Sequence, residues 1–180
     1  MIATLKSRAL FVACVFALLS LGFAQQREAS PKSVQRLQKE VRHELVMLPF
    51  LTVFDNLAYK VDGYNVTLLG QVVNPVLKSD AEKAVKNIEG VESVDNQIEV
   101  LPVSPNDDRL RRELYRAIYG YPALQRYALP VIEPIRIIVK NGHVTLEGVV
   151  DSEGDKNIAG LRANGISGVF SVQNNLAVSK

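Results

Sequence analysis

Residues 66–72 read VTLLGQV, and residues 144–150, which lie 78 positions later, read VTLEGVV. The same shift, without a gap, aligns residues 90–96 (GVESVDN) with residues 168–174 (GVFSVQN). Two blocks that keep one register and one spacing indicate an internal duplication, in which each copy is one supersecondary unit. The chain is therefore expected to contain one unit repeated twice.

The duplication extends upstream of these blocks. Residues 41–45 (VRHEL) resemble residues 110–114 (LRREL) at a shift of 69. Because this shift is smaller than 78, we expect the second copy to carry about nine extra residues between its first helix and its first strand.

Each copy reads as helix, strand, strand, helix, strand. In the first copy, Ser30-Pro31 opens a helix that runs to Pro49, with proline at the first helical position. Alternating apolar residues predict strands near 57–61 and 66–72, joined around Asp62-Gly63. A capping box at residues 79–82 (SDAE) is expected to open the second helix. Gly90 is expected to end that helix, and residues 94–100 form the last strand.

The second copy repeats this plan. Asp107 or Asp108 is expected to cap a helix that buries Leu110, Leu114, Ala117 and Ile118. Strands at 135–140 and 143–150 are joined by Asn141-Gly142, a strong hairpin signal. A helix near 155–164 and a strand at 172–178 complete the copy. The predicted fold is α+β, with two tandem αββαβ units, each a small three-stranded mixed sheet with two helices packed on one face.

Four glycines in the repeated blocks are expected to be structural. Gly70 and Gly148 lie within strands, where glycine marks a bulge or a close approach, and we expect a helix to pack against the sheet there. Gly90 and Gly168 are expected to be helix ends with positive φ.

The first 24 residues have the layout of a secretory signal peptide. Lys6 and Arg8 precede an apolar stretch at 9–21, and Gly22-Phe23-Ala24 offers small residues to a signal peptidase. An uncleaved anchor is the alternative, but thirteen helical residues span only about 20 Å, less than the roughly 30 Å hydrocarbon core of a membrane. We expect cleavage after Ala24 and export to the periplasm.

The remaining chain divides by composition. We expect an N-terminal segment at 25–33, a first domain at 34–101, a linker at 102–108 and a second domain at 109–178.

Composition excludes several functional classes. The only cysteine is Cys14, so an intrachain disulfide framework and a thiolate metal cluster are both excluded. Without Lys6 and Arg8, 19 basic residues balance 19 acidic ones, which argues against binding nucleic acid. A nucleophile elbow, a phosphate-binding loop and a dinucleotide fingerprint are all missing from the sequence. We expect no catalytic residues, no cofactor and no metal.

The charge is unevenly divided between the copies. Residues 25–108 hold 9 basic and 13 acidic side chains, whereas residues 109–180 hold 10 basic and 6 acidic ones. The second copy is therefore the better candidate for binding anionic phosphates. Alternatively, the opposite charges steer the two copies together, or two molecules head to tail.

The helix that starts near Arg109 is the candidate binding element. At about 100° per residue, the side of the helix opposite its apolar residues combines arginine with tyrosine, which suits a layer of lipid headgroups. These candidate contacts to anionic lipid are Arg112, Tyr115, Arg116 and Tyr119. In the alternative interpretation, the two tyrosines pack beneath the extra segment, which contains Tyr121, Pro122, Leu124 and Tyr127.

The repeated pattern, Val-Thr-Leu-x-Gly-x-Val followed by a helix and Gly-Val-x-Ser-Val-x-Asn, resembles the BON domain of bacterial osmotically induced and nodulation proteins. Residues 34–101 and 109–178 each show it. The resemblance implies an exported, non-enzymatic domain of the cell envelope that contacts phospholipid membranes, with a role in envelope protection under osmotic stress. The leading hypothesis is peripheral binding to an anionic phospholipid surface. The alternative is a periplasmic protein–protein adaptor.

Overall fold

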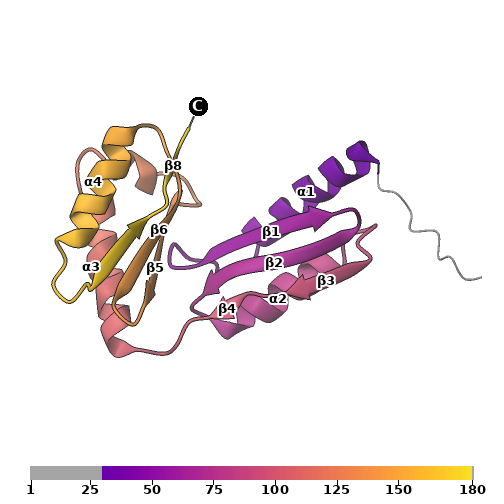
Figure 1. Ribbon diagram of the computed structural model, residues 1–180, viewed down its shortest axis with the longest axis horizontal. Helices are drawn as coiled ribbons and strands as arrows, with labels where there is room; N and C mark the ends of the chain where they lie inside the picture. Colours follow the sequence, from indigo (N-terminus) through magenta and orange to yellow (C-terminus); the bar gives the residue numbers. More distant parts are fainter. Residues whose placement is uncertain (1–29, 180) are drawn as a thin grey trace, which may run out of the picture.

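The computed structural model describes residues 30–179. The expected signal peptide lies outside the described residues. Within them, two αββαβ units follow one another, and in Figure 1 each unit carries its helices on one face of its own sheet. The α+β prediction of two tandem units is therefore confirmed.

In the first copy, the first helix and the two strands of the hairpin begin and end close to the predicted positions. The copy consists of α1 (Pro31–Val46), β1 (Asn56–Asp62), β2 (Asn65–Val72), α2 (Pro75–Lys86), β3 (Ser93–Asn96) and β4 (Glu99–Val100). β1 pairs antiparallel with β2, whereas β3 and β4 both pair parallel with β2. The core of this copy lies between the sheet and its two helices, which bury Leu37, Val41 and Leu45 from α1 and Leu77, Ala81 and Val85 from α2.

The second copy has the same topology with one added element. It consists of α3 (Pro105–Tyr119), the 3-10 helix η1 (Gln125–Ala128), β5 (Ile135–Lys140), β6 (His143–Val150), α4 (Glu153–Asn164), β7 (Ser171–Asn174) and β8 (Ala177–Val178). The hairpin prediction is confirmed, because Asn141 and Gly142 have φ values of 53° and 78°, as a tight primed turn requires.

The last strand of each copy is broken, although the sequence predicted one continuous strand. The side-chain amide of Asn96 donates to the Lys78 carbonyl (2.8 Å), and its oxygen accepts from the backbone N–H of Ile98 (3.2 Å). Asn174 makes the equivalent bonds to the Lys156 carbonyl (2.7 Å) and the Leu176 N–H (3.3 Å). These side chains replace bonds of the sheet ladder and tie the break to the neighbouring helix.

Two predicted helix starts are wrong, for one physical reason. α2 begins at Pro75, and the side chain of Asn74 caps it by accepting from the Val76 N–H (3.0 Å), so the expected capping box at 79–82 lies inside the helix. α3 begins at Pro105 with Ser104 as its cap. A capping side chain followed by proline is the stronger start signal, because proline fits the first helical position without losing a hydrogen bond. α3 therefore begins inside the stretch that was expected to be a linker.

Asp107 has a different role from the helix cap that the sequence predicted. Its buried carboxylate accepts from the backbone N–H groups of Asn141 (2.8 Å) and Gly142 (2.9 Å). Asp107 therefore fastens the turn of the β5–β6 hairpin to α3.

The repeat register of the first helices also needs correction. Arg36 pairs with Glu40 and donates to the Glu89 carbonyl (3.0 Å), and Arg109 pairs with Glu113 and donates to the Ser167 carbonyl (3.3 Å). These arginines are 73 residues apart, whereas the two carbonyls they bind are 78 apart. The second copy thus carries five extra residues before its hairpin, and the expected nine were one helical turn too many.

Gly70 and Gly148 allow a close approach of backbone, as expected, but no helix is involved. Their φ values are +109° and +118°, and a Cβ atom on either would overlap the carbonyl oxygen of Asn56 or Pro134, respectively, in the other arm of the hairpin. The expectation of helix packing there is wrong. Gly90 and Gly168 have the expected positive φ, but α2 ends at Lys86 and α4 at Asn164, so both glycines lie in the turns that follow these helices.

The extra segment is anchored by Tyr127. Its hydroxyl donates to the carboxylate of Asp155 (3.0 Å) and accepts from the backbone N–H of Asp151 (2.7 Å). Arg126 pairs with both aspartates. Burial alone would raise the pKa of Asp155, but the hydrogen bonds from Ser152 and Tyr127 and the charge of Arg126 outweigh it and lower that pKa.

A loop of the first copy docks on the second. The carbonyl of Val53 accepts from the N–H of Ile137 on the outer edge of β5 (2.9 Å), and the carbonyl of Thr52 accepts from Arg136 (2.9 Å). The side chain of Val53 is only 6% exposed and belongs to the core of the second copy. Asp55 holds the loop in shape, because its buried carboxylate accepts from the N–H groups of Thr52 (2.8 Å) and Val73 (2.7 Å).

The close backbone approach in the β5–β6 hairpin predicts that alanine has opposite effects on stability at two glycines of the second copy. Gly148→Ala is expected to lower the free energy of unfolding by about 2 kcal/mol or more, because alanine combines an unfavourable positive φ with the overlap at Pro134. Gly154→Ala, in the first turn of α4, meets only an ordinary contact and is expected to raise it by up to about 1 kcal/mol. Urea unfolding measures both, and equal effects would contradict this account.

The anchor at Asp155 predicts loss of stability in acid. A carboxyl with a lowered folded-state pKa adds stability above its unfolded pKa of about 3.9, and that stability is lost as the pH falls through the folded pKa. We expect the urea midpoint to fall below about pH 4, and Asp155→Asn to show a smaller fall from a lower starting value. Parallel pH profiles of the two proteins would contradict this role.

Candidate functional site

Three of the four residues that were predicted to lie on the outward face of α3 are accessible there. Arg112 and Arg116 are exposed and Tyr115 is half-buried, whereas Tyr119 is only 4% exposed. The Tyr119 hydroxyl donates to the Ile135 carbonyl (2.7 Å) and accepts from the Ile135 N–H (3.1 Å). Burial strongly raises the pKa of Tyr119, so this hydroxyl stays protonated at neutral pH.

The outward placement of Tyr119 is therefore wrong, and the alternative interpretation describes it correctly. Tyr119 lies in the same buried cluster as Leu124 and Tyr127 of the extra segment. Because that segment covers a second side of α3, the buried stripe of this helix is wider than its leucine and isoleucine spacing suggests.

A groove lies beside the exposed arginines. It has a volume of about 510 Å³ and runs between α3 and the docked loop of the first copy. The ring of Phe54 meets Tyr115 edge-on with 6.4 Å between centroids, and Tyr115 lies 4.9 Å from Tyr119. The groove is lined by Leu51, Thr52, Val53, Phe54, Arg112, Tyr115, Arg116 and Glu133. It therefore combines an aromatic wall with two cations and one carboxylate.

Arg112 and Arg116 differ from the other arginines of the second copy. Five arginines of this copy donate hydrogen bonds to named partners: Arg109, Arg111, Arg126, Arg136 and Arg162. Within residues 30–179, the side chains of Arg112 and Arg116 make no hydrogen bond or ion pair. Their guanidinium groups remain available to an external anion.

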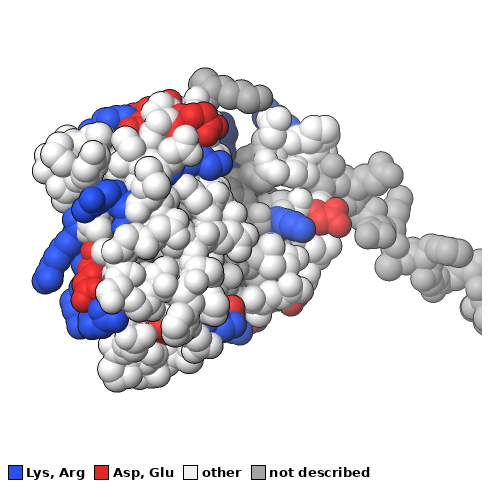
Figure 2. Space-filling view, turned by 60° about the vertical axis from the view of Figure 1, so that its left-hand side comes forward, with Lys and Arg blue, Asp and Glu red and all other residues white. Residues whose placement is uncertain are grey.

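Charged side chains are unevenly distributed over the face of the molecule that Figure 2 shows. Figure 2 brings the second copy forward and shows Lys and Arg side chains toward the left-hand edge of the view, with Asp and Glu side chains among them and at the top, whereas the centre of this face is largely uncharged.

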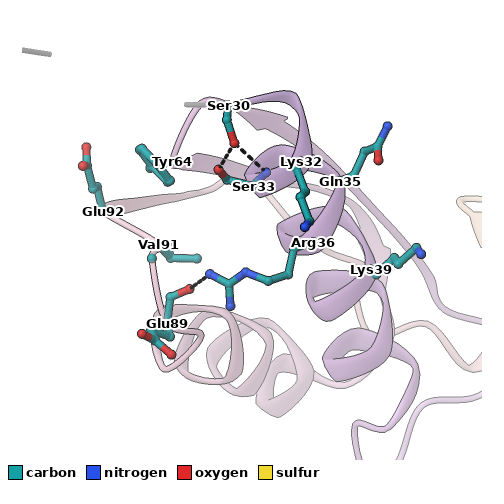
Figure 3. A pocket seen from close by; sticks show the side chains of 11 residues that line it. Ser30, Lys32, Ser33, Gln35, Arg36, Lys39, Tyr64, Glu89, Val91 and Glu92 are labelled. Atoms are coloured by element: carbon teal, nitrogen blue, oxygen red, sulfur yellow. Dashed lines mark hydrogen bonds between the residues drawn. The ribbon is translucent and has the colours of Figure 1, made fainter. Parts of the chain in front are cut away.

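A larger hollow in the first copy is structural in character. It measures about 820 Å³ and lies between α1 and the turn at residues 89–92. In Figure 3, Arg36 reaches from α1 to the carbonyl of Glu89, while Ser30 bonds to Ser33 at the start of the helix. Since Arg109 makes the same contact in the second copy, Arg36 connects the helix to the turn. The acidic residues here, Glu89 and Glu92, are both exposed.

The two histidines are exposed, one on each copy. His43 is exposed on α1, and His143 bonds to Ser171 (2.7 Å) on the surface of the second sheet. Among residues 30–179, His, Cys, Asp and Glu side chains form no cluster of three that could hold a metal ion. The described helices also include none long and apolar enough to cross a membrane.

Sequence reasoning missed the loop that forms one wall of the groove. Residues 50–54 (FLTVF) are apolar although they connect a helix to a strand. An apolar run in a connecting segment is the signal that could have indicated a docking loop, because connecting loops are usually polar.

Comparison with known proteins connects the two units to one domain family. The family model of the BON domain matches residues 33–102 and again residues 106–180. A comparison with curated proteins finds no match. One solved structure with some similarity is the C-terminal domain of CdsD, a structural protein of the type III secretion system of Chlamydia trachomatis. It is 13% identical over 80% of this chain and 98% of its own, with a TM-score of 0.28. A second CdsD structure from the same organism is 15% identical over 81% of this chain and 94% of its own, with a TM-score of 0.29.

The burial of Tyr119 predicts a contrast between two neighbouring tyrosines. Tyr119→Phe removes a hydroxyl that serves both the N–H and the carbonyl of Ile135, and is expected to lower the free energy of unfolding by about 1–3 kcal/mol. Tyr115→Phe is expected to change it by less than about 0.5 kcal/mol. Urea unfolding at neutral pH checks both values, and a neutral Tyr119→Phe would contradict the assignment.

Proposed function

The chain belongs to the BON domain family, a non-catalytic domain family associated with membrane and envelope proteins, and we propose that it is a non-enzymatic exported protein that binds anionic phospholipid surfaces in the cell envelope. The proposed location is the periplasm, and the proposed role is protection of the envelope under osmotic stress. The contact surface is the exposed face of α3 with the adjoining groove.

The observation that carries this proposal is the pair of arginines at 112 and 116. They stand one helical turn apart, are exposed, and have no carboxylate partner in the described part of the chain. A guanidinium binds a phosphate through two parallel hydrogen bonds, which makes arginine well suited to lipid headgroups. Tyr115 lies between them on the same face, where its ring can rest at the boundary between headgroups and acyl chains.

The charge division sets the orientation of the protein. The second copy carries a net charge of +4 and the first copy one of −4, counted over residues 109–180 and 25–108. A basic residue near an anionic membrane surface contributes about 1 kcal/mol, so the second copy approaches the surface and the first copy points away from it. Glu133 in the groove opposes binding, which makes the interaction modest and sensitive to salt.

A protein–protein adaptor is the second candidate. It is favoured by exposed aromatic side chains in each copy, Phe50 and Phe170, which lie outside the groove. Large apolar side chains on a surface are typical of protein contacts. A membrane protein of the envelope would be a partner of this kind.

Co-sedimentation with liposomes tests the lipid proposal. The protein is mixed with vesicles of phosphatidylcholine that contain increasing phosphatidylglycerol, at two salt concentrations. We expect the bound fraction to rise with anionic lipid and to fall with salt. The double variant Arg112→Glu, Arg116→Glu is expected to weaken binding by about tenfold or more, because it replaces two cations at the surface with two anions.

A charge-matched control separates the site from overall charge. Lys32→Glu with Lys39→Glu makes the same change in net charge on α1 of the first copy, where both lysines are exposed. We expect this control to bind nearly as well as the unmodified protein. Equal losses in the two variants would rule out α3 as the contact face. No binding to any vesicle would favour the adaptor, and crosslinking in intact envelopes would then be used to find a protein partner.

A further inference from the structure

The contact between the two copies is a donor–acceptor pair built from repeated parts. The donor is the loop before β1, whose Val53 carbonyl and side chain dock on the second copy. The acceptor is the outer edge of β5, through the N–H of Ile137, together with the adjoining face of α3. Since both copies have the same fold, each copy has a counterpart of both parts.

The donor of the second copy is exposed. The 78-residue shift places Leu129-Pro130-Val131-Ile132-Glu133 on Leu51-Thr52-Val53-Phe54-Asp55. Hairpin geometry supports this alignment, because Gly70 is approached by the carbonyl of Asn56 and Gly148 by that of Pro134, again 78 residues apart. Val131 is therefore the counterpart of Val53. Val53 is 6% exposed, whereas Val131 is 101% exposed.

The acceptor of the first copy is open as well. β1 corresponds to β5, and Tyr59 corresponds to Ile137. β1 is an edge strand, and in the described part of the chain only β2 pairs with it. A groove of about 310 Å³ lies between its outer edge and α1, and its lining includes Arg42, Leu45, Leu57 and Tyr59. One end of this groove is closed by Leu51 and Asp55 of the docking loop and by Arg136 of the second copy, and the rest is open to a partner. At the helix shift of 73 and the strand shift of 78, these residues correspond to Tyr115, Ile118, Ile135 and Ile137, which surround the docked loop in the second copy.

The geometry points to head-to-tail self-association, in which the loop around Val131 of one molecule docks on β1 and α1 of the next. The exposed loop and the open edge are the two unfilled halves of a contact that this chain already makes between its own copies. Such an interface is heterologous, so repetition produces a ring or a filament rather than a closed twofold dimer. The opposite net charges of the two copies favour the same orientation.

One difference between the copies makes the contact between molecules weaker than the internal one. Arg136 donates to the Thr52 carbonyl in the internal contact, and its counterpart on β1 is Ala58, which is exposed and has no side-chain donor. This difference provides a gain-of-function variant. Ala58→Arg supplies the missing donor, and Ala58→Glu places a carboxylate opposite the incoming carbonyl.

Sedimentation equilibrium of the full chain tests the assembly. Concentrations from about 10 μM to about 1 mM are appropriate, because linked domains experience effective concentrations in the millimolar range. We expect the mean mass to rise with concentration. Val131→Glu is expected to lower the association constant by about tenfold or more, since it would bring a carboxylate into an apolar contact. Val103→Glu is the matched control, because Val103 is 97% exposed and has no counterpart in the contact.

Mixing two variants tests the direction of the contact. Val131→Glu keeps an intact acceptor and Ala58→Glu keeps an intact donor. Each alone is expected to stay monomeric, and the mixture is expected to form a one-to-one dimer that does not grow further. Ala58→Arg is expected to raise the association constant several-fold.

Three outcomes would overturn the proposal. They are a protein that stays monomeric to about 1 mM, an assembly that Val131→Glu and Val103→Glu affect equally, and a mixture of the two blocked variants that forms no dimer. Circular dichroism and urea midpoints confirm that each variant is folded. Because the substituted positions are exposed, these measurements are expected to match those of the unmodified protein.

Discussion

The buried carboxylate of Asp55 supports the arrangement of the whole molecule. It takes hydrogen bonds from the N–H groups of Thr52 and Val73 and from the Thr52 hydroxyl, which closes the loop before β1 into one shape. That shape presents the Val53 carbonyl to the edge of β5. The groove beside α3 exists because this loop forms its second wall. A local hydrogen-bond cluster in one copy thereby shapes a binding surface on the other.

Much of the fold could be predicted, because strand and turn signals are local. The two strands of the second hairpin begin and end as expected, since alternation and Asn141-Gly142 determine them together. The broken last strand could not be predicted, because Asn96 fits the alternation and its helix partner is distant in sequence. The helix register was off by one turn, since an amphipathic stripe looks the same after a shift of four residues.

Only the part of the candidate site that lies on α3 could be predicted from the sequence. Periodicity placed Arg112, Tyr115 and Arg116 on a face away from the leucines, and these three side chains do line the groove. It misplaced Tyr119, because a helical wheel holds no information about a segment that returns to cover a second side. The loop at Val53 contributes from another copy of the repeat, and its contact with Ile137 depends on tertiary structure that no local pattern encodes.

The five-residue insertion explains why two copies of one unit have become different. In the first copy the N–H of Val73 is satisfied by Asp55, which ties down the docking loop. In the second copy the equivalent N–H, that of Asp151, is satisfied by the hydroxyl of Tyr127, which the insertion supplies. Glu133, the counterpart of Asp55, is therefore not needed for this bond and faces the groove instead. Because Tyr127 takes over this bond, Glu133 does not tie down the loop at Val131, and that loop lies at the surface. One insertion therefore both shapes the groove and leaves the second docking loop exposed.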